Sequence, residues 1–398
     1  ARLLTCGWWL RSLRLRTSGE CMFEKVSGKA IKLLVDKNNN RKPETMSEVK
    51  TKDQKDQLVY CGIDTHQHSW KVAILQNGHF VKVFSQEPGT KQLATHLQQH
   101  YPGAHYQLGY EAGFCGFWIV EEFKSLGIDC KVLHAADIPT TDKERRQKTD
   151  ARDCRKIALS LANPGGIRSI HVPEKELQYD RSTVRARLKI SRDATRVRNR
   201  VKAHLHFYGL SLGKDLPRYW SKVFIDSLRQ WSIDQRDVAL GLLLDELMAL
   251  RQLKAKALQE LRKLARQDRY ASKIKLLMSI PGLGLLHAVS FATEIGDIKR
   301  FKNLDQLCSM IGLIPNTNAS GEKAGVGRMT KRGKTEVKNL LIEAAWVAIR
   351  CDPDLKVSFE RLSQRMQKNK AIVRIAKKLL NRIRTVLIQN KPYKIAVC

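Results

Sequence analysis

Residues 58–64 have the sequence Leu-Val-Tyr-Cys-Gly-Ile-Asp, and this short apolar run decides the fold of the first half of the chain. Its β-branched and aromatic residues predict a strand. Two more strand-like runs follow at residues 70–75 and 80–84, with Asn77-Gly78 as a hairpin turn between them. The pattern then alternates helix, strand, helix, strand and helix, at residues 91–100, 105–111, 117–126, 130–133 and 151–161. A strand meander followed by this alternation predicts an α/β domain over residues 58–162.

Residues 163–270 are predicted to form a linker and a long helical region. Asn163-Pro164-Gly165-Gly166 interrupts the alternation, and two long helices are expected at residues 176–208 and 238–266. The second helix has apolar residues at nearly the coiled-coil period: Leu240, Leu243, Leu247, Leu250, Leu253, Ala257, Leu261 and Leu264. This spacing is typical of a dimerisation or RNA-gripping stalk, and equally of a helical hairpin packed on its own domain.

Residues 271–398 are predicted to be a mostly α-helical domain. The run Ile280-Pro281-Gly282-Leu283-Gly284 has the pattern of a helix-hairpin-helix, whose glycine turn offers backbone N–H groups to a phosphate. Gly282 and Gly284 are therefore candidate nucleic-acid-binding residues. A polar, basic loop is expected at residues 315–334, and helices at 336–350, 355–367 and 371–389. Residues 1–57 are predicted to be a tail, or sequence upstream of a native start near Met46.

The charge of the chain indicates a polyanionic partner. Its 398 residues include 72 Lys and Arg against 39 Asp and Glu, a formal net charge of +33. Each cation placed on a phosphate releases a counterion, so nucleic acid is favoured over a merely basic soluble surface. The segment 181–202 concentrates this charge in Arg185, Arg187, Lys189, Arg192, Arg196, Arg198 and Arg200. These residues are candidates to hold RNA or DNA phosphates; the alternative is a structural amphipathic helix.

Composition narrows the class of protein further. Apolar residues make up 42% of the chain, which indicates globular domains rather than disorder. No run of about 18 apolar residues occurs, so no membrane partner is expected. None of the nine cysteines forms a C-x-x-C pair, and Cys61, Cys115, Cys130 and Cys154 are expected to be buried free thiols. Such cysteines favour a reducing compartment and a cytoplasmic location.

Four carboxylates of the first domain form a candidate metal site. Asp64 ends the first predicted strand and Glu111 the fourth, while Asp150 and Asp153 open a helix at i, i+3 spacing, on one face. Carboxylates gathered in this way repel one another unless a cation lies between them, and hard divalent ions prefer oxygen ligands. Taken singly, Asp150 is also a plausible helix cap, and Asp153 a partner for nearby arginines.

Three stretches resemble the DEDD motifs of one transposase family: Tyr60-Cys61-Gly62-Ile63-Asp64, Tyr110-Glu111-Ala112-Gly113 and Lys148-Thr149-Asp150-Ala151-Arg152-Asp153. The family comprises the Piv-type DNA invertases and the insertion-sequence "one-ten" recombinases, and its first domain resembles the RuvC resolvase fold of RNase H type. The resemblance extends over roughly residues 58–390. It implies that Asp64, Glu111, Asp150 and Asp153 are catalytic residues that bind Mg²⁺ (or Mn²⁺).

A second catalytic residue is implied by the C-terminal region. Ile311-Gly312-Leu313-Ile314-Pro315, Ser320-Gly321 and residues 325–333 resemble the transposase domain of the same family, in which a serine joins covalently to a DNA phosphate. Ser320 occupies the matching position. Basic residues that would hold the scissile phosphate surround it: Lys323, Arg328, Lys331, Arg332 and Lys334. Without the resemblance, Ser320-Gly321 would be interpreted as a turn in a solvated basic loop.

The resemblance implies an insertion-sequence transposase or site-specific recombinase of the bacterial cytoplasm, associated with the nucleoid. It further implies a non-coding guide RNA, donor and target DNA as substrates, a dimer or tetramer, and active sites assembled in trans or across domains. Two alternatives from other classes stay open at this point. One is a metal-dependent, hydrolytic junction resolvase in which Ser320 takes no part. The other is a non-enzymatic nucleic-acid scaffold with a degenerate nuclease fold.

Overall fold

The computed structural model describes residues 57–141, 149–163, 165, 167–210, 220–320, 323–330 and 332–395. For residues 317–320 and 323–328 it describes the backbone alone. The chain divides into two compact units, residues 1–170 and 171–398. Nearly all of the predicted N-terminal tail, residues 1–56, lies outside the described part.

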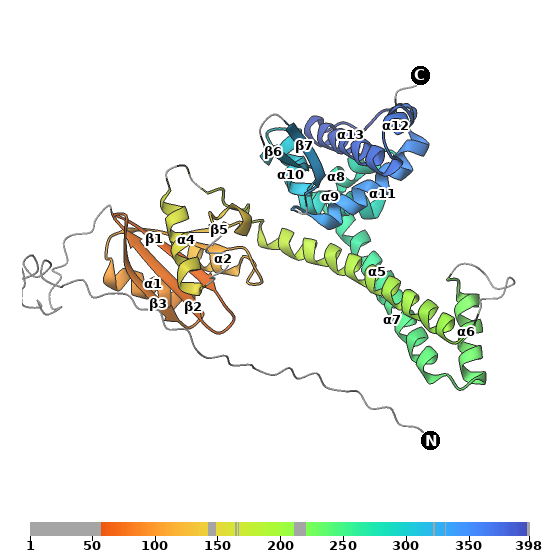
Figure 1. The fold of residues 1–398 in the computed structure, drawn as a ribbon, viewed down its shortest axis with the longest axis horizontal. Helices are drawn as coiled ribbons and strands as arrows, with labels where there is room; N and C mark the ends of the chain where they lie inside the picture. Colours follow the sequence, from red (N-terminus) through yellow and green to blue (C-terminus); the bar gives the residue numbers. More distant parts are fainter. Residues whose placement is uncertain are drawn as a thin grey trace, which may run out of the picture. The chain divides into compact units, whose positions relative to one another are not determined.

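The first unit is a mixed α/β domain, as predicted (Figure 1). Its elements are β1 (Leu58–Thr65), β2 (Trp70–Gln76), β3 (His79–Gln86), α1 (Thr90–His100), β4 (His105–Glu111), α2 (Trp118–Ser125), β5 (Asp129–Leu133), the short 3-10 helix η1 (Ala135–Asp137) and α4 (Asp150–Ala162). The sheet order is β3-β2-β1-β4-β5. Strands β1, β2 and β3 pair antiparallel, whereas β4 is parallel to both β1 and β5. All five predicted strands are therefore confirmed, and so is the turn at Asn77-Gly78, where both residues have positive φ.

Helix α4 covers one face of the sheet, and Gly62 lets it approach closely. A Cβ atom on Gly62 would lie 2.1 Å from the carbonyl oxygen of Cys154 and 2.5 Å from the amide nitrogen of Ala158. Real side chains never approach backbone atoms so closely, so β1 and α4 can pack in this way only around a glycine. Gly109 on β4 faces the same helix, since its Cβ would touch the Leu161 side chain.

Helices α1 and α2 lie against the opposite face. The Tyr106 hydroxyl of β4 donates to the carbonyl oxygens of Leu97 and Tyr101 at the end of α1. The rings of Trp70 and Trp118 join β2 to α2, with centroids 5.9 Å apart. Strands β1 and β2 are thus largely buried on both sides, which explains why they are almost continuously apolar, whereas β3 at the edge has no buried residue.

The second unit is helical apart from one β-hairpin (Figure 1). Its elements are α5 (Lys175–Phe207), α6 (Lys222–Asp234), α7 (Val238–Arg266), α8 (Asp268–Met278), α9 (Leu285–Ile295), the 3-10 helix η2 (Ile298–Arg300), α10 (Leu304–Ile311), β6 (Pro315–Ser320), β7 (Lys323–Met329), α11 (Thr335–Cys351), α12 (Pro353–Arg365) and α13 (Lys368–Gln389). The long helices predicted for α5 and α7 are confirmed. Helix α6 was missed, because the segment is short and lies between two much stronger helical patterns.

Helices α5 and α7 pack side by side as an antiparallel hairpin within one chain. At one end, Ala194, Val197 and Val201 of α5 share a core with α6 and with Leu240, Leu244 and Leu247 of α7. At the other end, Val184, Leu261 and Leu264 enter the core of the C-terminal helices. Both ends of the apolar seam of α7 are therefore used inside the chain, which supports the helical-hairpin interpretation, whereas Leu253 in its middle is 49% exposed. The helical region and the C-terminal helices also share one core.

One expectation for the second unit is wrong. The polar stretch at residues 315–334 was expected to be a loop, but most of it forms the antiparallel pair β6–β7. Its Gly and Asn residues hid the strands, because the backbone pairing of a two-stranded hairpin needs no apolar alternation. Among the described residues, no helix is both long and apolar enough to span a membrane.

Candidate active site and nucleic-acid interface

The sheet register places Asp64 beside Glu111. Strands β1 and β4 are parallel, and the last pair in their register is Ile63 with Tyr110. Asp64 and Glu111 are the next residue of each strand, so they end neighbouring strands at the same edge. Both have the same strand parity as Gly62 and Gly109, the two glycines that face α4. The expectation that these carboxylates meet at one sheet edge therefore follows from the observed pairing.

The N-terminal turn of α4 carries the other two carboxylates, of which Asp150 lies close to Asp64. Thr149 is the N-cap residue, and Asp150 is the first residue of the helix, so the interpretation of Asp150 as a cap is wrong. Asp153 follows one turn later and forms an ion pair with Lys156, at 3.6 Å between Oδ1 and Nζ. Carboxylates in a first helical turn are stabilised by the helix dipole. Both acidic residues thus occupy a favourable position at the end of α4.

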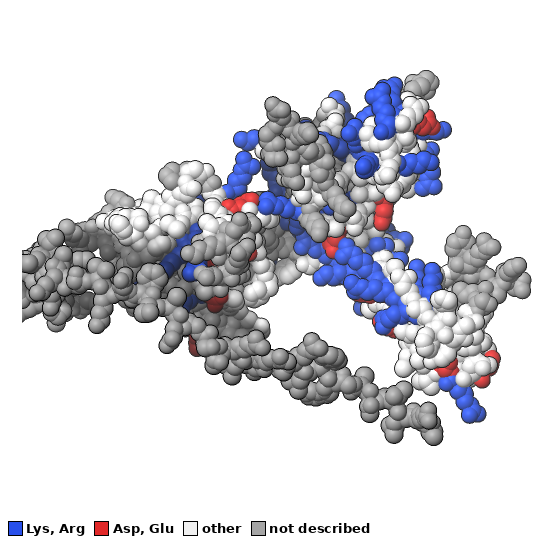
Figure 2. All heavy atoms as spheres, viewed as in Figure 1, with Lys and Arg blue, Asp and Glu red and all other residues white. Residues whose placement is uncertain are grey.

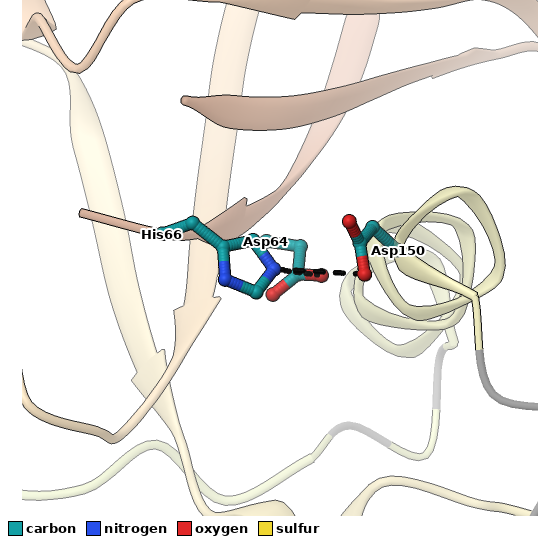
Figure 3. A group of neighbouring side chains, drawn as sticks. All are labelled: Asp64, His66 and Asp150. Atoms are coloured by element: carbon teal, nitrogen blue, oxygen red, sulfur yellow. Dashed lines mark ion pairs between the residues drawn. The ribbon is translucent and has the colours of Figure 1, made fainter. Parts of the chain in front are cut away.

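Two of the four carboxylates form a compact cluster with a histidine (Figure 3). One ligand atom each of Asp64, His66 and Asp150 lie within 4.8 Å of one another. His66 Nε2 is 3.4 Å from Asp64 Oδ2 and 3.6 Å from Asp150 Oδ1. The sequence analysis missed His66. Its signal was the i, i+2 spacing from Asp64 at the end of a strand, which directs both side chains to the same face.

The cluster lies at the boundary between a buried helix–sheet contact and solvent. The Asp64 side chain is 19% exposed, whereas those of His66 and Asp150 are 51% and 60% exposed. Just below the cluster, Cys154 is buried against β1, and burial together with the charge of Asp64 raises its pKa to about 11. Cys154 is therefore a neutral packing residue. Cys61 and Cys154 are buried free thiols, as expected, whereas Cys115 and Cys130 are partly exposed.

Ser320 lies at the end of β6, at the tip of the hairpin. Its backbone pairs with that of Lys323, the first residue of β7, and Arg328 lies further along the same strand. Lys331 falls outside the described residues. The predicted serine and two of its basic neighbours thus occupy one hairpin, because strand pairing folds residues 315–329 back on themselves.

The base of this hairpin is closed by a close backbone approach. A Cβ atom on Gly312 would lie 2.2 Å from the carbonyl oxygen of Arg332, and one on Gly333 would lie 2.6 Å from the Gly312 nitrogen. The Lys334 amide donates to the carbonyl oxygen of Met310, 3.0 Å away. These contacts explain why Gly312 and Gly333 are glycines, because a side chain at either position would keep apart the two chain segments that carry the hairpin.

Next to the hairpin base lies a buried ion cluster around Glu294 of α9. Arg185 donates two hydrogen bonds to the Glu294 carboxylate, at 2.6 and 2.9 Å, and Lys334 Nζ is 3.4 Å from it. Arg181 donates to the carbonyl oxygens of Thr293 and Glu294. Burial by itself raises the pKa of Glu294, but the hydrogen bonds from Arg185 and the nearby cations outweigh it and lower the pKa. Glu294 is thus an anionic anchor between α5, α9 and the start of α11.

Comparison with known proteins finds two transposase domains along the chain. Residues 61–209 match the DEDD transposase domain of IS110 type, and residues 274–360 match the Transposase IS116/IS110/IS902 family. The chain therefore carries both transposase domains of IS110-type insertion sequences. The matched ranges contain all the predicted carboxylates and Ser320.

Relatives of the transposase include named insertion-sequence proteins. The y4qE protein of Sinorhizobium fredii is 26% identical over 297 residues, which cover 72% of this chain and 71% of the relative. The transposase for insertion sequence element IS1111A of Coxiella burnetii is 25% identical over 278 residues, covering 68% and 75%. The transposase for insertion sequence element IS1533 of Leptospira borgpetersenii is 27% identical over 259 residues, covering 62% and 72%.

The basic helix of the transposase carries two kinds of arginine. Figure 2 shows Lys and Arg side chains along the α5–α7 hairpin. Four of the predicted binding residues form ion pairs within the unit: Arg185 with Glu294, Arg192 with Glu336, Arg196 with Asp193 and Arg200 with Glu246. Arg187 and Arg198 instead have a buried Nε atom without a hydrogen-bond partner, and Lys189 is exposed. The structural interpretation of α5 therefore applies to these four arginines, and nucleic-acid binding by the other cations of the helix stays a prediction.

The two glycines of the predicted helix-hairpin-helix differ in their surroundings. A Cβ atom on Gly282, which has a φ of +90°, would lie 2.4 Å from the carbonyl oxygen of Ala344 on α11. Gly282 is thus required for helix packing. Gly284 is exposed and is the N-cap residue of α9, with nothing within 4 Å of such a Cβ. The open N-terminus of α9 is therefore the part of this turn that remains accessible.

Proposed function

We propose that this transposase cuts and rejoins DNA through a covalent link to Ser320, with a divalent metal ion held by Asp64, Glu111, Asp150 and Asp153. The observation that carries the proposal is the meeting of β1, β4 and the first turn of α4, where Asp64 and Asp150 contribute to one compact cluster. The match of residues 61–209 to a DEDD transposase domain supports it. An RNase H-like class for the first unit is part of this proposal.

The donor set of the cluster fits a divalent ion. Such ions bind oxygen ligands at about 2.0–2.6 Å, so two ligands of one ion lie roughly 3–4 Å apart. His66 Nε2 meets this requirement with Asp64 Oδ2 at 3.4 Å and with Asp150 Oδ1 at 3.6 Å, and ligand atoms of all three residues lie within 4.8 Å of one another. Glu111 is placed beside Asp64 by strand register, and Asp153 shares a helix face with Asp150. When bound, the ion would act as a Lewis acid that stabilises charge on the phosphate oxygens.

The proposed strand cleavage is a transesterification. The Ser320 hydroxyl loses its proton, and its oxygen forms a bond to phosphorus while the bond to the displaced sugar oxygen breaks and that oxygen takes up a proton. Basic residues that follow Ser320 in the sequence, Lys323, Arg328, Lys331 and Arg332, balance the charge of the phosphate. Attack of a sugar hydroxyl on the phosphoserine reverses the step on a new strand. The number of phosphoester bonds is conserved, so rejoining needs no ATP.

The nucleic-acid partners are proposed from charge and family. A net charge of +33 and the exposed cations of α5 support the binding of donor and target DNA and of a non-coding guide RNA. The N-terminus of α9 beside Gly284, in a helix-hairpin-helix, would bind a backbone phosphate. We also propose that the active form is a dimer or tetramer.

The experiment that tests this function traps the covalent link. The full chain is incubated with labelled element ends and the RNA transcribed from the flanking DNA, then denatured and examined for a protein–DNA adduct. Wild type should give the adduct, and Ser320→Ala should not. Ser309→Ala on α10, an exposed serine outside the hairpin, is the matched control and should behave as wild type.

Two results would overturn the proposal in different ways. If Ser320→Ala still cleaves DNA and wild type gives no adduct, the protein is a hydrolytic nuclease. If Asp64→Asn recombines as well as wild type, the carboxylates take no part and the protein is a nucleic-acid scaffold. Removal of RNA by ribonuclease before DNA is added should abolish recombination, and unchanged recombination would reject the guide RNA.

A further inference from the structure

His66 is the one member of the metal-binding cluster that the four-carboxylate motif does not contain. It follows β1 directly, in the turn that leads to β2. Its backbone amide donates to the carbonyl oxygen of Ser69, 3.2 Å away, which fixes this turn. The ring enters the space between the end of β1 and the start of α4, with Nε2 directed toward both carboxylates (Figure 3). The backbone thus sets the position of the imidazole.

The distances within the cluster suit ligands of a shared ion better than direct hydrogen bonds. Nε2 lies 3.4 Å from Asp64 Oδ2 and 3.6 Å from Asp150 Oδ1. A charge-assisted N–H···O bond is typically about 2.7–2.9 Å long. Two ligands that are each about 2.1 Å from one ion lie roughly 3.0–3.5 Å apart. The two distances from Nε2 are therefore closer to those between ligands of one divalent ion than to the length of a charge-assisted hydrogen bond.

An ion pair alone gives a weaker explanation of this arrangement. His66 and Asp150 are more than half exposed, and exposed ion pairs contribute little to stability. Such a pair would gain little from holding one imidazole equally close to two carboxylates from different elements. A metal ion would gain a third ligand, and the exposed side of the cluster would stay open to the phosphate of a substrate.

We propose that His66 binds the metal ion through Nε2, together with Asp64 and Asp150, and that this nitrogen makes the site prefer Mn²⁺ to Mg²⁺. The inference rests on the proposed function, since it assumes that the carboxylates hold a metal. Mg²⁺ strongly prefers oxygen ligands, whereas imidazole suits transition metals, whose affinities rise from Mn²⁺ along the first row. One nitrogen among carboxylates therefore favours Mn²⁺.

The first test measures metal affinity in the full chain by titration calorimetry, with Mn²⁺ and Mg²⁺ separately. His66→Ala should weaken Mn²⁺ binding at least about tenfold. It should change Mg²⁺ binding less than about threefold, so that the preference for Mn²⁺ falls. His68→Ala is the matched control, because His68 is an exposed histidine in the same turn and lies outside the cluster. It should leave both affinities unchanged.

The second test detects the nitrogen ligand directly, and its first measurement uses the wild-type protein alone. Pulsed electron paramagnetic resonance of the Mn²⁺-loaded wild type should show a ¹⁴N coupling that becomes a ¹⁵N coupling when histidine is labelled with ¹⁵N. The coupling should persist in His68→Ala and disappear in His66→Gln. A merely structural histidine would give no such coupling.

The outcomes separate this inference from the proposed function. If Asp64→Asn removes Mn²⁺ binding while His66→Ala binds Mn²⁺ as wild type does and no nitrogen coupling appears, His66 is not a ligand, and the carboxylate site stands. If Asp64→Asn also leaves Mn²⁺ binding unchanged, both the metal site and the assignment of His66 are overturned.

Discussion

The two units of this transposase hold their candidate catalytic residues in different ways. In the first unit, Asp64 and Asp150 lie at the ends of a buried strand and a packed helix, which the contact at Gly62 fixes against each other. In the second unit, Ser320 ends a strand of a two-stranded hairpin that is anchored at its base by Gly312 and Gly333. A metal site needs several ligand atoms within a few ångströms, so it requires rigid elements. A nucleophile needs only one atom delivered to phosphorus, and a hairpin tip can provide that.

The largest effect is expected from the carboxylates. Asp150→Asn removes a metal-binding charge while keeping the shape of the side chain, so recombination in a two-plasmid assay should fall by about a thousandfold or more. Asp129→Asn is the control, because Asp129 on β5 pairs with Lys131 and lies outside the cluster. Thermal unfolding should be nearly unchanged for both variants. If Asp150→Asn recombined as well as Asp129→Asn, Asp150 would have no catalytic role, and the first unit could not be compared with the second as a metal site.

The rigidity of the first unit depends on Gly62. Gly62→Ala forces a Cβ to within 2.1 Å of a backbone oxygen of α4, so it should destabilise the unit by about 3 kcal/mol or more. Gly109→Ala meets only the Leu161 side chain, at 3.0 Å, and should destabilise it by about 1 kcal/mol. Both losses of stability can be measured by hydrogen exchange of the amides in β1 and β4. Similar protection in the two variants would show that the close approach of α4 is not what fixes the acidic edge.

The anchor of the second unit is tested at Glu294. Arg185→Met leaves this carboxylate, which is 5% exposed, with Lys334 as its remaining side-chain ion-pair partner among the described residues, and should destabilise the unit by about 3 kcal/mol. Arg196→Met breaks an ion pair with Asp193 in which the arginine is 74% exposed, and should change stability by less than about 1 kcal/mol. The difference in the free energy of unfolding between the two variants is measured by urea titration, with hydrogen exchange of the α9 amides as a local probe. Equal stability of the two variants would contradict the structural assignment of Arg185.

The smallest effect is expected at Lys189. Because Lys189 is exposed on α5, Lys189→Ala should leave unfolding unchanged and lower the slope of log affinity against log salt by about 1, for DNA or RNA of any sequence. Arg200→Ala, which removes one member of an ion pair with Glu246, should lower this slope less. A slope that is lowered more by Arg200→Ala would reverse the division of α5 into structural and binding residues.

The predictability of the site differed between the units for physical reasons. Strand ends and i, i+3 spacing are local properties, so the sheet-edge carboxylates and the face shared by Asp150 and Asp153 could be predicted from the sequence. His66 escaped notice because it becomes part of the cluster only when α4 closes on β1. The seven cations of α5 form one group in the sequence, yet four of them form ion pairs with carboxylates. Three of these carboxylates lie on α7, α9 and α11, between 46 and 144 residues away along the chain.

By itself, the sequence determined the order of strands and helices in the first unit, the extent of α5 and α7, the basic character of the chain and the identity of its acidic residues. Each of these follows from spacing or charge along the chain. The tertiary structure alone decided that the α7 seam is used within one chain, that Gly282 packs against α11, that the stretch around Ser320 is a hairpin and that His66 joins two carboxylates. These features depend on contacts between distant segments, and local spacing contains no information about which distant backbone or charge a residue will meet.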